Sequence, residues 1–205
     1  AWTGGAALPK ALSAYALAAF EGRMYLFGGW DGVGYSREVY AYNPEEAGGG
    51  AWETLTPMPT GRAYAGAAAS GGKIYVMGGK NETGMSLNVN QIYTPALDDG
   101  SNDPWENGMP LPRGRYSMGM TSSADLLFVM GGLSDEPGKL WPLQFAPAAK
   151  IWQTVEAPLE GDWAGLGLVS IGTQLYAIGG QVDGEPTDQN LSYQAFFTIA
   201  VPLIP

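Results

Sequence analysis

Lys73-Ile74-Tyr75-Val76-Met77-Gly78-Gly79 is one of four related stretches in a chain of 205 residues. Each stretch is an apolar and aromatic run that ends in a glycine pair. This pattern is typical of a buried strand followed by a turn with positive φ or close backbone approach. The other copies span 23–29, 126–132 and 174–180, and their first glycines follow one another at steps of 50, 53 and 48 residues. A repeat of that length predicts stacked modules or blades.

Two further landmarks repeat in phase with the glycine pairs. A tryptophan lies 26 or 27 residues before each pair, and a proline follows that tryptophan after six or seven residues. An aromatic-x-proline element lies between each of the first three pairs and the next tryptophan. The landmarks divide each repeat into a small apolar strand a, a strand b that ends in Gly-Gly, a strand c and a tryptophan-bearing strand d. Four antiparallel strands per unit predict an all-β propeller.

The repeats resemble those of the Kelch family. The likeness rests on the glycine pair, the separated tyrosine and tryptophan, and the turns Pro59-Thr60-Gly61-Arg62 and Pro112-Arg113-Gly114-Arg115. It covers essentially the whole chain. The first and last units depart from the pattern, because Leu12 and Asp162 lie near the positions where arginine is expected. The resemblance implies one Kelch-type propeller domain over residues 1–205. Its repeat units are approximately 12–61, 62–114, 115–162, and 163–205 plus 1–11.

The phase of the strands predicts how the ring closes. The chain starts in a strand d at Trp2 and stops after a fourth strand c at Tyr193 to about Val201. We therefore expect four blades, with the N-terminal strand completing the last blade and removing an open sheet edge. The Kelch resemblance implies rings of six or seven blades in most cases. An arc completed by further sequence or by a second copy is the alternative.

Charge and composition limit the possible partners. Ten basic and twenty acidic residues give a formal net charge of -10, with the basic residues scattered along the chain. Such a surface repels a phosphate backbone and an anionic membrane, so we expect no nucleic-acid partner and no membrane insertion by this chain. The acidic charge, low lysine content and apolar tail 196–205 favour a bacterial extracellular, cell-surface or periplasmic location, with the cytoplasm as the alternative.

The chain has neither histidine nor cysteine. The commonest general base and the usual soft metal ligands are therefore missing, and the copper chemistry of Kelch-like oxidases does not transfer to this sequence. Carboxylate chemistry of the kind implied by sugar-isomerising Kelch enzymes remains the enzyme alternative. No carboxylate pair has a spacing that demands it, so we expect no catalytic residues and no cofactor.

Alternating connections of an antiparallel meander place the d-to-a and b-to-c loops on one face, called the loop face here. Loops on a rigid scaffold are where binding residues concentrate. The arginines of the Pro-x-Gly-Arg turns have two interpretations, which are clamping a carboxylate or holding the turn against a neighbouring blade. The aromatics Trp30 and Tyr35 either pack the loop or contact a partner. The partner-binding candidates are Trp30, Asp31, Tyr35, Arg62, Lys80, Arg115, Asp135 and Glu136.

On the opposite face, Asp98-Asp99-Gly100-Ser101-Asn102-Asp103 is rich in oxygen ligands and contains a glycine turn. Asp98, Asp99 and Asp103 are calcium candidates, but the terminal glutamate of a helix-loop-helix site is missing. The alternative interpretation is a solvated loop.

These observations favour a non-catalytic binding or assembly module. We expect it to engage a protein partner or a glycan through the loop face. The alternatives are a carbohydrate-processing enzyme that uses carboxylates and a purely architectural subunit of a larger complex.

Overall fold

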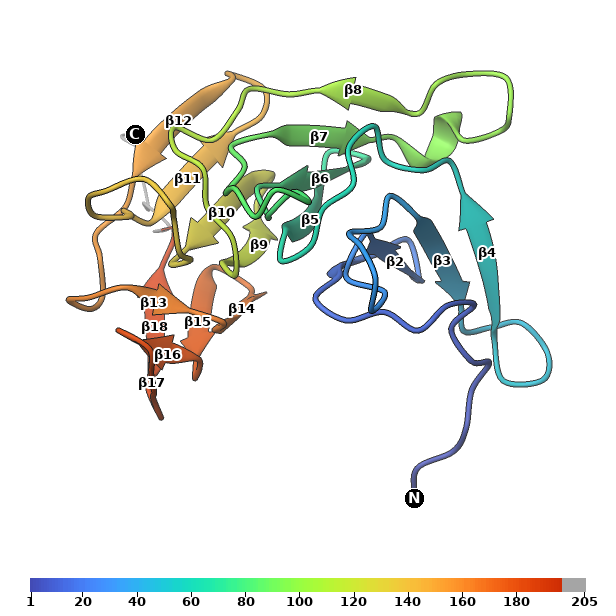
Figure 1. Cartoon of the computed structure of the whole chain (residues 1–205), viewed down its shortest axis with the longest axis horizontal. Helices are drawn as coiled ribbons and strands as arrows, with labels where there is room; N and C mark the ends of the chain where they lie inside the picture. The colour runs from blue at the N-terminus through green and yellow to red at the C-terminus, as the bar shows by residue number, and fades with distance from the viewer. Residues whose placement is uncertain (197–205) are drawn as a thin grey trace, which may run out of the picture.

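The structure, a computed structural model, describes residues 1–196 and shows an open arc of β-sheets (Figure 1). Within these residues the regular structure is strand apart from the 3-10 turn Pro95–Leu97. No helix in the described part is long and apolar enough to cross a membrane. The strands are β1 (Ala16–Phe20), β2 (Arg23–Phe27), β3 (Val39–Asn43), β4 (Ala51–Leu55), β5 (Gly66–Ser70), β6 (Lys73–Met77), β7 (Asn90–Tyr93), β8 (Trp105–Asn107), β9 (Gly119–Ser123), β10 (Leu126–Met130), β11 (Leu143–Ala146), β12 (Ile151–Thr154), β13 (Trp163–Ala164), β14 (Gly167–Ile171), β15 (Gln174–Ile178), β16 (Gln181–Val182), β17 (Glu185–Pro186) and β18 (Asn190–Gln194).

The sheets are propeller blades, as the sequence predicted. Blades 1, 2 and 3 are the four-stranded antiparallel sheets β1–β4, β5–β8 and β9–β12, and blade 4 is the three-stranded sheet β14-β15-β18. A small sheet of β13, β16 and β17 lies in the loops of blade 4. The inner strands β1, β5, β9 and β14 contact one another in this order. In blade 2 the register places Tyr75 opposite Ala68 on one side and Ile92 on the other.

The hydrophobic core lies between the blades. Tyr25 and Phe27 of β2 share one buried cluster with Ile74 and Val76 of β6. The same positions of β6 and β10 form the next cluster, and those of β10 and β15 form the third. Alternate side chains of each strand b therefore face opposite neighbours. Stability is made largely at these nearest-neighbour interfaces, which explains why the apolar stretch is repeated.

The glycine pairs let consecutive blades approach closely. Gly28, Gly78 and Gly131 have φ between 62° and 64°. A Cβ at these positions would lie 2.4, 2.3 and 2.0 Å from a backbone carbonyl oxygen of the next blade. The second glycine of each pair donates its N–H to that same carbonyl, as in the 2.9 Å bond from Gly79 to Arg115. Glycine is required here both for its conformation and for the missing side chain.

The structure does not show the predicted closure of the ring. Trp2 is fully exposed, and no strand includes residues 1–10. The N-terminal segment instead lies against blade 1, where the Ala6 N–H donates to the Gly49 oxygen at 3.2 Å. The Trp52 indole in turn donates to the Ala6 oxygen at 3.0 Å. These bonds hold the segment away from blade 4, whose strand β18 contains Tyr193, while residues 197–201 of the predicted last strand lie outside the described residues.

The blade contacts predict different costs for the same substitution at two glycines. Gly78→Ala should lower the free energy of unfolding by about 3 kcal/mol, because the new methyl group meets the Arg115 carbonyl in addition to the strain of positive φ. Gly179→Ala has the same φ of 62° but meets no atom closer than 3.9 Å. It should cost only about 1 kcal/mol. Urea unfolding of both variants measures the difference, and equal losses would contradict the role of close approach.

Candidate functional site

Arg62 and Arg115 lie inside the protein rather than on its surface. Their exposed fractions are 0% and 2%. The Arg62 guanidinium donates to the Gly78 oxygen at 3.3 Å and to the Gln91 side chain. Arg115 donates to the oxygens of Gly131 at 3.2 Å and Trp141 at 3.1 Å. Burial lowers the pKa of each arginine to about 10, so both remain charged at neutral pH.

Each arginine connects two blades. Its side chain donates to the first glycine of its own blade, while its main-chain oxygen accepts the N–H of the second glycine of the preceding blade. This geometry matches the turn-holding interpretation. Neither guanidinium is available to a partner, and we leave both out of the binding surface.

Trp163 fills the arginine position in blade 4. Its indole N–H donates to the Gly179 oxygen at 2.7 Å, and its main-chain oxygen accepts from Gly132 at 2.7 Å. The repeat pattern in the sequence had pointed to Asp162 as the residue near this position, and it did not identify Trp163. Spacing along the sequence would have identified Trp163. The position sixteen residues before the first glycine of each repeat is occupied by Leu12, Arg62, Arg115 and Trp163.

A strip of aromatic residues crosses the loop face of blades 1 to 3. Trp30 is 37% exposed and packs edge-on against Tyr35 at a centroid distance of 5.5 Å. Trp30 and Ser13 form a β-bridge at the start of blade 1, next to the exposed Tyr15. Tyr64 is 42% exposed, donates its N–H to the Ala14 oxygen at 2.8 Å, and packs against Tyr116 of blade 3 at 6.4 Å. We call Tyr15, Trp30, Tyr35, Tyr64 and Tyr116 the aromatic strip.

Tyr15, Tyr64 and Tyr116 were not among the residues predicted from sequence. They lie at the start of strand a, which was expected to be small and apolar. Tyr64 has a φ of 60°, and its equivalents Ala14, Ser117 and Gly165 also have positive φ. This backbone turn directs the chain over the loop face. The residue types at the four equivalent positions do not predict it.

Asp31 fixes the loop that carries Trp30 and Tyr35. Its carboxylate pairs with Lys10 at 2.5 Å and accepts the N–H groups of Val33 and Gly34 at 2.9 and 2.8 Å. The hydrogen bond from Lys10 and those from the two backbone groups hold the pKa of Asp31 well below its usual range. Asp31 therefore acts as the internal support of this loop.

The loops of blades 2 and 3 are connected by contacts among Lys80, Ser86 and Asp135. The Ser86 N–H donates to Asp135 at 2.5 Å, and the Asp135 N–H donates back to the Ser86 hydroxyl at 3.2 Å. The bond from the Ser86 backbone, with support from the Ser86 hydroxyl and Lys80, lowers the pKa of Asp135. Lys80 lies 3.7 Å from Asp135 and 4.1 Å above the Tyr116 ring. Glu136 pairs with Arg113 at 3.7 Å and is mostly exposed.

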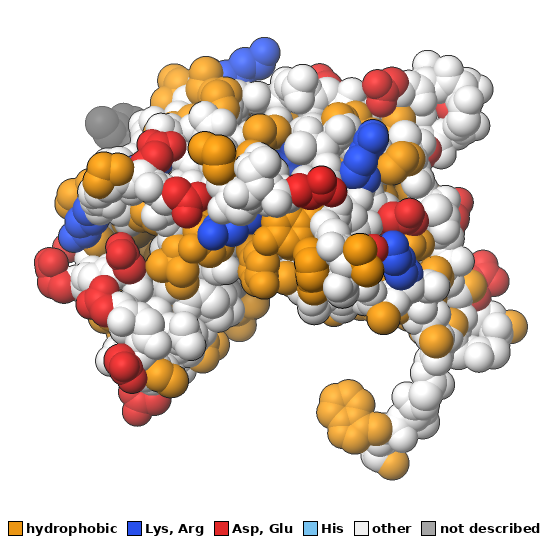
Figure 2. Space-filling view, viewed as in Figure 1, with side chains coloured by type: hydrophobic (Ala, Val, Ile, Leu, Met, Phe, Trp, Pro, Cys, Tyr) orange, Lys and Arg blue, Asp and Glu red, His pale blue; other side chains and the backbone are white. Residues whose placement is uncertain are grey.

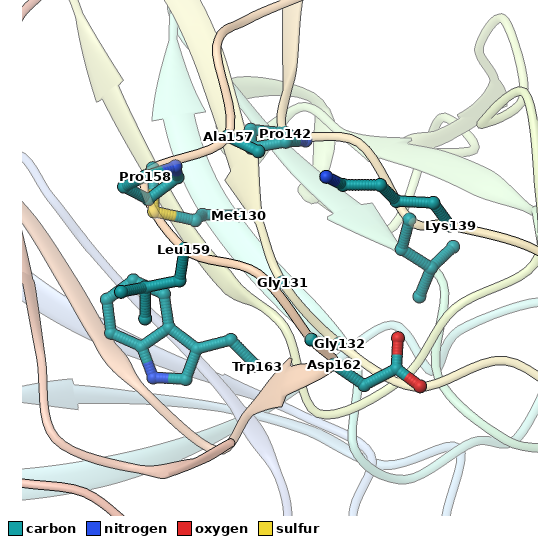
Figure 3. A pocket seen from close by; sticks show the side chains of 12 residues that line it. Met130, Gly131, Gly132, Lys139, Pro142, Ala157, Pro158, Leu159, Asp162 and Trp163 are labelled. Carbon is teal, nitrogen blue, oxygen red and sulfur yellow. The ribbon is translucent and has the colours of Figure 1, made fainter. Parts of the chain in front are cut away.

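The hollow between the loops of blades 3 and 4 is small. Figure 3 shows Trp163, Leu159 and Met130 together in this hollow, with Lys139 and Asp162 away from them. The cavity volume is about 20 Å³, which is room for about one or two water molecules. A broader hollow beside the axis is lined by Ser117, Leu133, Ala164, Gly165, Gly180, Gln181 and Pro186.

The acidic loop on the opposite face stabilises the protein's own structure and connects blade 2 to blade 1. Asp98 accepts hydrogen bonds from the Thr56 N–H at 2.9 Å, the Thr56 hydroxyl at 2.6 Å and the Tyr93 hydroxyl at 2.6 Å. Asp99 accepts from the Ser101 N–H and Asp103 from the Trp105 N–H. Within the described part of the chain no three acidic residues form a group that could hold a metal ion.

Consecutive four-stranded sheets that pack around an axis define a β-propeller protein. The Kelch motif model matches residues 11–59 and 61–111. Kelch-like protein 35 of Mus musculus is 24% identical over 193 residues, which cover 94% of this chain and 31% of that protein. Kelch-like protein 40 of Xenopus laevis is 28% identical over 163 residues, which cover 78% of this chain and 24% of that protein. The two matched motifs and the similarity to Kelch-like proteins support a Kelch repeat protein.

A solved structure supports the fold independently. The chain superimposes on YjhT with a TM-score of 0.75 at 20% identity, over 95% of this chain and 67% of that chain.

The two Kelch-like relatives are much longer than the present chain, which spans less than a third of either.

Replacing the indole of Trp163 tests its role as the counterpart of the arginines. Trp163→Phe keeps most of the buried ring but leaves the Gly179 oxygen without its donor, so the free energy of unfolding should fall by about 1–3 kcal/mol. The matched control is Trp141→Phe, since Trp141 is 47% exposed. Guanidinium unfolding followed by fluorescence measures both, and an equal effect of the two changes would refute the assignment.

Asp98 makes stability depend on pH in the acid range. Burial opposes its ionisation, but the hydrogen bonds from Thr56 and Tyr93 outweigh burial and lower its pKa. The stabilisation is therefore complete above the unfolded-state pKa of about 4 and is lost as pH falls through the lower folded-state pKa. Asp98→Asn should cost about 1–2 kcal/mol at pH 7. Thermal unfolding from pH 7 to pH 2 should show this difference shrinking below pH 4, whereas the exposed Asp99→Asn should change little at any pH.

Proposed function

We propose that this chain is a non-catalytic protein-binding module that engages a partner protein through its loop face. The observation that carries the proposal is the aromatic strip, in which Trp30 and Tyr64 are more than a third exposed although large aromatic side chains usually find cover. Tryptophan and tyrosine are enriched among the residues that dominate protein–protein binding energies. Two exposed apolar residues of the b-to-c loops, Val33 and Met85, extend this surface.

The loops beneath the strip are already fixed, which favours binding. Asp31 organises the loop of blade 1, and the reciprocal bonds of Ser86 and Asp135 join the loops of blades 2 and 3. A preorganised surface loses less conformational entropy on association than a mobile one. The charged candidates Asp31, Lys80 and Asp135 therefore act mainly by holding the aromatic residues in place.

The hollows of the loop face favour binding over catalysis. The space beside Trp163 admits only about one or two water molecules. The lining of the axial hollow includes no aspartate, glutamate, lysine or arginine that would serve as an acid, a base or a charged anchor. A third hollow of the loop face is lined by Asp135, Glu136 and Asp162, but Asp135 already bonds to Ser86 and Glu136 pairs with Arg113. A broad surface of exposed aromatic residues suits a partner protein better than a small substrate.

Affinity capture with matched variants tests this proposal. The immobilised chain is incubated with extract of its native source, the captured proteins are identified, and the dissociation constant of each purified candidate is measured by calorimetry. The double variant Trp30→Ala, Tyr64→Ala should weaken a genuine partner at least tenfold, because each truncation removes an aromatic contact of about 1–2 kcal/mol. The chain should keep its unfolding midpoint, since both residues are partly exposed.

The control is Leu97→Ala, which removes an exposed apolar side chain from the opposite face. It should leave the affinity unchanged. A partner that binds the double variant as tightly as the unaltered chain, or that is lost with Leu97→Ala instead, would refute the loop face as the binding surface.

A further inference from the structure

A groove lies where the connection from blade 2 to blade 3 passes the strands β11 and β12. Its volume is about 240 Å³, somewhat below the roughly 300–1,000 Å³ of sites for drug-sized molecules. Arg113, Arg115 and Lys139 line it, together with apolar residues that include Trp141 and Leu143. The whole chain has only ten lysines and arginines, and those visible in Figure 2 form small, separate patches. Three around one groove are therefore a concentration of positive charge.

Arg115 lacks an acceptor that its counterpart in blade 2 has. The Arg62 guanidinium donates to the Gln91 side chain, whereas Leu143 occupies the position of Gln91 in the sheet of blade 3. Among the described residues Arg115 donates through Nη1 alone, to two backbone oxygens, and its buried Nε has no partner. Arg115 therefore keeps the charge of Arg62 without the side-chain acceptor.

Trp152, which also lines the groove, differs from its counterparts in the same way. The indole N–H groups of Trp52 and Trp105 donate to backbone oxygens at 3.0 and 3.1 Å. The Trp152 indole nitrogen is buried and has no acceptor within residues 1–196. Buried donors in proteins nearly always have a partner. Of the four buried side-chain atoms without one in the described part of the chain, two belong to residues of this groove.

The neighbouring carboxylates do not fill this gap. Glu136 lies 3.7 Å from Arg113, and Glu160 lies 3.9 Å from Lys139, but the two glutamate side chains are 62% and 100% exposed. Such exposed pairs are weak, and neither glutamate lines the groove. Burial, and after it the charge of Arg113, lower the pKa of Arg115 to about 10. An anion inside the groove would favour the charged form of both arginines.

We infer that this groove binds a small carboxylic acid with a flat apolar body. The two oxygens of a carboxylate match the paired donors of a guanidinium, and Arg113 and Lys139 add positive charge beside Arg115. Walls formed by two tryptophans and Leu143 favour a ring over a strongly hydrated ion such as phosphate.

The site is separate from the aromatic strip, and the inference does not rest on the proposed partner protein. Arg115 is 2% exposed, so the surface of a partner protein does not reach it. A small molecule inside the groove lies beside it, because Arg115 is part of the lining.

Titration of the whole chain with sodium benzoate, followed by NMR, gives the first test. Benzoate should shift the Trp152 indole N–H and the Arg115 Nε–H signals in a saturable way, with a dissociation constant on the order of 1 mM for so small a ligand. Benzamide has the same shape without the charge and should bind at least tenfold more weakly, and inorganic phosphate should shift neither signal. The inference fails if benzoate shifts neither signal, or if benzamide or phosphate binds as tightly as benzoate.

Two substitutions of one wall residue give the second test. Leu143→Gln supplies the amide acceptor that Gln91 gives to Arg62, so it should weaken benzoate binding at least tenfold. Leu143→Met has a similar length without an acceptor and should change the affinity by less than about twofold. An equal loss in the two variants would contradict a role for the unpaired donors. Thermal unfolding checks that both variants fold.

A change of charge tests the site without altering its buried wall. Lys139→Gln should weaken benzoate binding at least threefold, whereas Lys150→Gln, which removes an exposed lysine outside the groove, should have no effect. This pair decides the question if Leu143→Gln does not fold, and equal affinities in the two lysine variants would overturn the inference. The double variant Trp30→Ala, Tyr64→Ala should bind benzoate normally. Loss of benzoate binding and loss of partner binding are therefore distinguishable.

Discussion

The close approach of consecutive blades at the glycine pairs is the constraint on which the rest of this structure depends. A carbonyl of each following blade occupies the space where a side chain would stand on Gly28, Gly78 or Gly131. The second glycine of each pair donates its N–H to that same oxygen. Packing of strand b against both neighbours follows from this spacing. The repeated apolar residues and the repeated glycines are therefore two parts of one interface.

Polar groups buried at the same interface explain why one repeat position carries arginine twice and tryptophan once. The carbonyl of the first glycine lies inside the protein and needs a donor. Arg62, Arg115 and Trp163 all provide one, although their charges differ. An isolated buried charge is costly, and the lowered pKa values of both arginines reflect that cost. The indole of Trp163 achieves the same bond without a charge, so in blades 2 to 4 the position is defined by its donor, whereas Leu12 at the equivalent position of blade 1 has no side-chain donor.

The sequence was sufficient to predict the blades because their period and glycine pairs follow directly from packing. It was not sufficient to predict closure. The phase of Trp2 matched a missing strand, but the bonds of Ala6 with Gly49 and Trp52 lie between segments that no repeat relates. In the structure Trp30, Tyr35, Asp31, Lys80 and Asp135 lie in or next to the b-to-c loops, as the sequence predicted, and their part in binding stays a prediction. Tyr64 was missed since its exposure depends on a positive φ that a tyrosine rarely adopts.

The aromatic strip and the outer side of blade 4 are separate surfaces with different physical characters. The strip crosses the loop ends of blades 1 to 3, and its aromatic residues lie among charged groups that already have partners. The side of blade 4 that faces away from blade 3 carries the exposed aliphatic side chains of Val169, Ile171 and Ile178. The strip lies on the loop ends of the sheets, whereas this surface is the side of one sheet. A partner that covers the strip would therefore leave the side of blade 4 exposed.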